Sequence, residues 1–284
     1  MRRCLKFGVQ CSILVAIVFC LIATSSVHGQ SKQEVDLIEA KKNFDADPSE
    51  ENIIWYGRRT AYTGDYDKAI AIYTDGLKKY PKSYKLLRHR GHRYISKRKF
   101  DLAIADLSKA EALMAGAPLE IEQDGIPNKL NKPLSTTQFN VFYHLALGYY
   151  LKGDFAKAET TWKKCLAVCE NDDSKVAVID WLYMTMRRQG KHEQAKALLN
   201  DINESMEIIE NDSYYQRLLM YKNGTPLPVP ETPLDIATLG YGLGNWYYYN
   251  GDKVKAKEIF QKVVEGKESA AFGYIAAETD LKRI

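Results

Sequence analysis

Apolar residues recur at spacings of three and four along much of the chain. Phe142, Leu145, Ala146 and Tyr149, for example, would share one face of a helix. Such a helix has an apolar stripe that another helix must cover. The pattern therefore predicts an all-α fold built from amphipathic helices.

A turn of the form Gly-Asp-aromatic-x-x-Ala separates these helical segments. Clear copies begin at Gly64 and Gly153, and looser copies begin at Lys99, Gly190 and Gly251. If the alanine of each copy is position 20 of a unit, the units begin at Glu50, Tyr84, Phe139, Val176 and Ala237. The first two units are 34 residues apart. A spacing of this length predicts stacked helix pairs, each too small to bury its own apolar face.

Two positions in the units follow a size rule. Position 8 is small in four units, and its residues are Gly57, Gly91, Ala146, Tyr183 and Gly244. Position 24 is large in all five units, and its residues are Tyr73, Leu107, Trp162, Leu199 and Phe260. Only Tyr183 departs from the rule. With this signature the chain resembles the tetratricopeptide repeat family over most of residues 50–266. The resemblance implies an α-solenoid of about five helix pairs, with the first helix of each pair lining a concave face.

Two stretches interrupt the repeats. Residues 115–138 contain three prolines and Gly125, which forbid a continuous helix and predict an irregular insertion. Long irregular loops inside a domain are often functional, although a solvated connector is the alternative. Residues 203–233 combine an apolar pattern suited to one extra helix with four prolines. The prolines predict a stiff connector.

The first residues have the pattern of a secretory signal. Arg2, Arg3 and Lys6 precede a short apolar run, and small residues follow it up to Gly29. The run is shorter than the roughly 20 residues that span a bilayer. We expect an exported chain, periplasmic or extracellular, with no stable membrane span once the signal is removed. An uncleaved anchor is the alternative, and bulky Phe19 argues against a lipoprotein site at Cys20.

The expected organisation follows from these features. It comprises a signal peptide (1–29), a capping helix (30–49), two repeat units (50–114), the insertion (115–138), two further units (139–202), the extra helix and connector (203–233), a fifth unit (234–266) and a C-terminal capping helix (267–284).

Charge and cysteine content exclude several classes of protein. Three of the 40 basic residues and none of the 36 acidic ones lie in residues 1–29, so the remaining chain has a formal charge of +1. Such a balance argues against a nucleic-acid partner held by bulk charge. Only Cys165 and Cys169 lie outside the signal, which is no disulfide framework. We expect Cys165 to pack inside the third unit.

No catalytic motif is present, and we expect neither a catalytic residue nor a cofactor. His89 and His92 would supply only half of a metal site, because zinc needs at least three protein ligands. The acidic residues Glu120, Glu122 and Asp124 of the insertion offer an alternative, a hydrolase-like site where the insertion meets the groove. A purely structural subunit is the second alternative.

In tetratricopeptide domains, five positions of the first helix usually face the groove. Carried onto this sequence, the resemblance implies partner contacts by Arg58, Lys85, Arg88, His92, Asn140, Tyr143, Tyr150, Arg187, Tyr241, Asn245 and Tyr248. Arginine grips carboxylates with two bonds, and tyrosine supplies a large, stiff contact. The sequence therefore predicts a module or assembly scaffold that holds a peptide or protein, or a glycan, with an acidic group.

Overall fold

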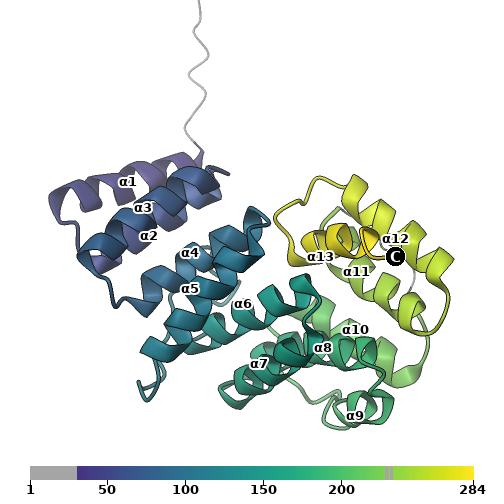
Figure 1. Cartoon of the computed structure of the whole chain (residues 1–284). Coiled ribbons are helices and arrows are strands. Elements are labelled where there is room, and N and C mark those ends of the chain that lie inside the picture. The colour runs from purple at the N-terminus through teal and green to yellow at the C-terminus, as the bar shows by residue number, and fades with distance from the viewer. Residues whose placement is uncertain (1–30, 228–229, 231–232) are drawn as a thin grey trace, which may run out of the picture.

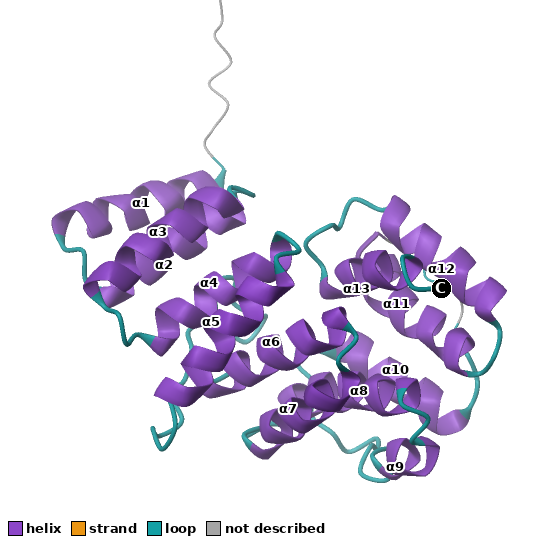
Figure 2. Ribbon diagram, in the orientation of Figure 1, coloured by secondary structure: helices purple, strands orange, loops and turns teal. Residues whose placement is uncertain are grey.

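The computed structural model describes residues 31–227, 230 and 233–284. Within these ranges every regular element is an α-helix, which confirms the all-α prediction (Figure 2). The expected signal peptide lies outside the described residues, as do four residues of the proline-rich connector, 228–229 and 231–232. No described helix is both long and apolar enough to cross a membrane.

Ten of the described helices form five consecutive antiparallel pairs. They are α2 (Glu50–Tyr62) with α3 (Tyr66–Lys79), α4 (Tyr84–Ser96) with α5 (Phe100–Leu113), α6 (Thr137–Lys152) with α7 (Phe155–Ala167), α8 (Asp172–Arg188) with α9 (His192–Ala197), and α11 (Pro233–Tyr249) with α12 (Lys253–Glu265). Three further helices flank the pairs: α1 (Lys32–Ala46), α10 (Asp212–Asn223) and α13 (Phe272–Leu281). Figure 1 shows the pairs following an arc that begins at α1 and ends at α12.

Paired helices touch at the positions that the size rule marks. A Cβ atom on Gly57 would lie 2.3 Å from Cε1 of Tyr73, and one on Gly244 would lie 2.5 Å from Cε1 of Phe260. The ring of the second helix therefore fills the space that the missing side chain leaves. This contact confirms the tetratricopeptide type of helix pair.

The fourth pair is irregular where its sequence breaks the size rule. Tyr183 occupies the small position, and its ring stacks on Tyr221 of α10 with centroids 4.4 Å apart and planes at 7°. Helix α9 has only six residues, and α10 also packs against α8. The extra helix thus covers part of the surface that a longer second helix would cover.

Helix α13 meets the turn after α4 across the arc. Arg98 stands in that turn with a φ of 59°, where other units carry glycine. Its Nε donates to Glu278 Oε2 at 2.8 Å, and its Nη2 donates to the carbonyl oxygen of Ser269 at 2.9 Å. A left-handed conformation costs a non-glycine residue roughly 1–2 kcal/mol. In this position the Arg98 side chain connects the second repeat unit to the C-terminal cap through these two hydrogen bonds.

The glycine contact in the first pair predicts a specific loss of stability. We expect Gly57→Ala to lower the free energy of unfolding by about 1–3 kcal/mol, because a methyl group overlaps the Tyr73 ring. Urea unfolding followed by circular dichroism measures this change. Lys78→Ala on the exposed face of α3 is the control, and an unchanged midpoint for Gly57→Ala would contradict the close approach.

Candidate functional site

The insertion folds back and lies against the helices that carry the predicted basic residues. Its two arms pair as an antiparallel bridge, in which the Thr137 amide donates to the Glu120 carbonyl at 2.8 Å and the Glu122 amide donates to the Ser135 carbonyl at 3.0 Å. Residues 119–125, which we call the acidic segment, are thereby held in an extended conformation beside α4.

Two carboxylates of the acidic segment bind two basic residues of α4. Lys85 Nζ lies 2.5 Å from Glu120 Oε1, and Arg88 Nη2 lies 2.8 Å from Glu122 Oε1. The Arg88 and Glu122 side chains are only 9% and 10% exposed, so this second ion pair is largely removed from water. A buried charge of this kind depends on its partner.

Two arginines of α2 bind the main chain of the acidic segment. Arg58 Nη1 donates to the Gln123 carbonyl and Arg59 Nη1 donates to the Gly125 carbonyl, each at 2.8 Å. Gly125 is buried, and a Cβ atom on it would lie 1.8 Å from the Tyr62 hydroxyl oxygen. The segment is thus seated by its backbone as well as by its carboxylates.

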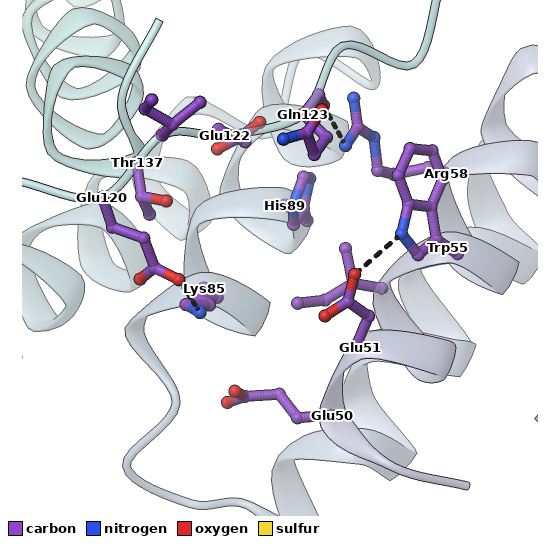
Figure 3. A pocket seen from close by; sticks show the side chains of 12 residues that line it. Glu50, Glu51, Trp55, Arg58, Lys85, His89, Glu120, Glu122, Gln123 and Thr137 are labelled. Carbon is purple, nitrogen blue, oxygen red and sulfur yellow. Dashed lines mark hydrogen bonds and ion pairs between the residues drawn. The ribbon is translucent and has the colours of Figure 1, made fainter. Parts of the chain in front are cut away.

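An open cleft of about 320 Å³ lies between α2, α4 and the acidic segment (Figure 3). We call it the outer cleft; its lining residues come from both helices and the insertion and are Glu50, Glu51, Ile54, Trp55, Arg58, Lys85, His89, Glu120, Ile121, Glu122, Gln123 and Thr137. The Arg58 guanidinium lies 4.6 Å from the Trp55 ring centre. The cleft therefore combines an aromatic surface with charges of both signs.

A second open space of about 310 Å³, which we call the inner cavity, lies among α4, α6, α8, α10 and α13. Four of its lining residues are aromatic: Phe139, Tyr143, Tyr214 and Phe272. The Tyr143 and Tyr214 hydroxyl oxygens are 3.2 Å apart, and the Phe272 ring lies 5.5 Å from the His144 ring. Because Leu134 and Ser135 also line it, the insertion borders both spaces.

Three histidines near these two spaces are held neutral. Burial, with smaller effects from nearby arginines, lowers the pKa of His89, His92 and His144 well below 6.5. His144 Nδ1 lies 2.5 Å from the Asn140 carbonyl oxygen. Since a carbonyl only accepts, Nδ1 carries the proton and Nε2 is an acceptor.

The predicted open groove at the C-terminal end is wrong. Tyr150, Tyr241 and Asn245 are at most 1% exposed. The Tyr241 hydroxyl donates to Asp280 Oδ2 at 2.8 Å, and Arg188 Nη2 donates to the same oxygen at 2.6 Å. Helix α13 brings this carboxylate among the tyrosines and fills the space in which a partner was expected.

The remaining predicted residues fall into three places. Arg58 and Lys85 line the outer cleft, and Arg88, His92, Asn140 and Tyr143 line the inner cavity. Arg187 and Tyr248 line neither space. Arg187 Nη2 donates to Asn250 Oδ1 at 2.8 Å, and the Arg188 guanidinium lies 4.1 Å from the Tyr248 ring centre. Contact with a partner stays a prediction for all of them.

Two of the three insertion carboxylates, Glu120 and Glu122, line the outer cleft. Glu120 and Glu122 each bind a basic residue, and Asp124 lines neither space, although burial raises its pKa. This arrangement does not favour the hydrolase-like alternative. In the part of the chain that the structure describes, no three His, Cys, Asp or Glu side chains gather as ligands for a metal ion.

Cys165 and Cys169, the cysteines of the described residues, form no disulfide there. Cys165 is fully buried, and burial raises its pKa well above the usual value. Cys169 Sγ lies 3.3 Å from the Cys165 carbonyl oxygen, and burial raises the pKa of Cys169 to about 12. Neither thiol is poised as a nucleophile.

Sequence reasoning missed the residues that reach the site from distant elements. Tyr214 and Phe272 come from an extra helix and a cap, whose positions no repeat rule specifies. The sequence does contain a feature that indicates the pairing of Glu122 with Arg88. An acidic stretch follows a basic helix in a chain of almost balanced charge. Complementary charge in a loop long enough to fold back would have suggested it.

Comparison with known proteins identifies one repeat by sequence. Residues 239–265 match a sequence model of the tetratricopeptide repeat family. No curated protein matches the chain in sequence.

Several solved structures are similar in fold. A tetratricopeptide repeat protein from Parabacteroides merdae is 15% identical with a TM-score of 0.47, covering 86% of this chain and 91% of its own. YrrB, described as having an unusual peptide-binding site, is 14% identical with a TM-score of 0.46. The match covers 84% of this chain and 97% of YrrB. TTC0263 from Thermus thermophilus is 15% identical with a TM-score of 0.43, covering 82% and 100%. These likenesses say nothing about function.

The buried histidines predict a dependence of stability on pH. Below about pH 6.5 the unfolded chain binds protons that the folded chain excludes. The free energy of unfolding therefore decreases as the pH is lowered, by about 1.4 kcal/mol per pH unit for each histidine. Urea unfolding at about pH 7.5 and about pH 5.5 measures the loss.

We expect His89→Gln to reduce this pH-dependent loss by about a third. His192→Gln, on the exposed surface of α9, is the matched control. Equal losses in the wild type and His89→Gln would show that His89 takes up its proton in the folded state.

Proposed function

We propose that this tetratricopeptide-repeat protein is an exported binding module that holds an extended acidic segment of a partner protein against its first two helix pairs. Folds of this kind typically serve as scaffolds for protein interactions. The observation that carries the proposal is the acidic segment itself, because the chain already binds one such peptide in cis. The basic signal-like start of the sequence supports export.

The contacts define the partner's chemistry. In an extended segment, side chains two residues apart point to the same side. Glu120 and Glu122 therefore reach Lys85 and Arg88, which lie on successive turns of one helix. A partner segment of the form Glu-x-Glu would present its carboxylates in the same way.

The arginines of α2 add affinity without reading sequence. Arg58 and Arg59 both donate to carbonyl oxygens, which every peptide offers. An extended backbone is the only requirement at these two contacts. Selection between partners would depend on the carboxylates, and the exposed Ile121 leaves the intervening position open to many side chains.

A partner has to compete with the tethered acidic segment. A segment on a short linker has an effective concentration on the order of millimolar. A free peptide of the same sequence should bind the wild type weakly. Loosening the segment should expose the site, and Gly125 is the position to change, since its buried contact with Tyr62 leaves no room for a methyl group.

The test uses a labelled peptide with the sequence of residues 118–125, titrated against the full chain and followed by fluorescence anisotropy. We expect Gly125→Ala to bind it at least about tenfold more tightly than the wild type. Lys129→Ala, at an exposed position of the same insertion, should behave as the wild type.

A peptide with both glutamates replaced by glutamine is the matched ligand control. It should bind Gly125→Ala at least about tenfold more weakly, because two charge-assisted contacts are lost. Equal binding of the two peptides, or no binding to Gly125→Ala, would refute the proposed site.

A further inference from the structure

The inner cavity adjoins the place where the acidic segment binds, because Arg88 contacts Glu122 and also lines the cavity. It is bordered by α4 of the second pair, by α6 and α8 of the third and fourth pairs, and by α10 and α13, and its phenylalanine and tyrosine side chains come from α6, α10 and α13. Its volume of about 310 Å³ lies at the small end of the range for ligand pockets. A space of this size accepts a compact ring.

Two buried nitrogen atoms beside the cavity have no hydrogen-bond partner among the described residues. They are Nε2 of His144 and Nε of Arg88, and both side chains line the cavity. The residues are 3% and 8% exposed. The first nitrogen accepts a hydrogen bond and the second donates one, and buried polar groups are rarely left unpaired.

The charges around the cavity favour an uncharged occupant. Arg88 is neutralised by Glu122, and His92 and His144 are held neutral, which leaves the Glu210 carboxylate as the unbalanced charge in the lining. Glu210 repels an anion. A cation such as a quaternary ammonium offers no acceptor to Arg88 Nε, although the aromatic rings and Glu210 would attract it.

The lining is rich in groups that recognise hydroxyls. Asn140, Asn211 and Ser174 add polar oxygen atoms to the two unpaired nitrogens, although the amide N–H groups of the two asparagines and the Ser174 hydroxyl already donate within the protein. A hydroxyl both donates and accepts, so several hydroxyls on one ring match this mixture. The Phe272 and Tyr214 rings offer flat apolar surfaces for the carbon–hydrogen face of such a ring.

We propose that the inner cavity is a binding site for an uncharged, hydroxyl-rich ring, of the class of a single sugar unit. His144 Nε2 accepts from one ligand hydroxyl, Arg88 Nε donates to another, and the aromatic walls hold the ring between them. Arg88 is common to this cavity and to the site of the acidic segment, whereas His144, Tyr214 and Phe272 line only the inner cavity. Variants of these three residues therefore test ring binding apart from peptide binding.

The test is saturation-transfer NMR on the full chain with glucose, N-acetylglucosamine and myo-inositol as probes, and with tetramethylammonium chloride as a cationic comparison. We expect at least one of the three hydroxylated rings to bind. Tyr214→Ala removes a half-buried wall of the cavity and should weaken that binding by about tenfold.

Two further variants complete the test. Trp55→Ala removes an aromatic side chain from the outer cleft and should leave probe binding unchanged. His144→Phe keeps a ring in the inner cavity but removes the Nε2 atom that accepts from the ligand, so weaker binding by this variant supports the proposal even if Tyr214→Ala does not fold. Failure of all three rings to bind, full binding by both cavity variants, or binding of tetramethylammonium alone would overturn it.

Discussion

The buried carboxylate of Asp280 determines how the arc of helices closes. It is fully buried, and it accepts hydrogen bonds from Arg188 of α8 and Tyr241 of α11. Tyr241 is in turn within 2.7 Å of the Tyr150 hydroxyl of α6. A buried ion pair that loses one partner typically destabilises a protein by about 3–5 kcal/mol. The last helix therefore cannot leave the inside of the arc without exposing an uncompensated charge in the core.

This closure explains why the inner side of the solenoid is divided. The C-terminal half is filled by α13, and the N-terminal half is occupied by the acidic segment, which leaves the outer cleft and the inner cavity as separate spaces. Phe272 at the start of α13 lies 5.4 Å from the His92 ring of α4. One wall of the inner cavity thus depends on the same helix that Asp280 holds in place.

The repeat made the fold predictable, whereas the site depends on long-range contacts that no local rule specifies. Gly57 and Tyr73 identify a helix pair from sequence because their contact lies within one unit. Tyr150 and Tyr241 occupy helix positions that usually face a groove, yet they are buried because a cap 30 or more residues after Tyr241 supplies Asp280. The basic residues were found because charge on a helix surface can be read locally. Their partner in the insertion depended on how a loop folds back.

Arg88 contacts both the acidic segment and the inner cavity. Its Nη2 binds Glu122 of the acidic segment, while the same side chain borders the cavity and its Nη1 donates to His89. If an uncharged segment took the place of the acidic segment, the guanidinium would be buried without a counter-charge, at a cost of about 3–5 kcal/mol. An apolar or basic segment would not recover that energy. A replacing segment must therefore be acidic, because only a negatively charged acceptor at the position of Glu122 neutralises the buried Arg88 guanidinium.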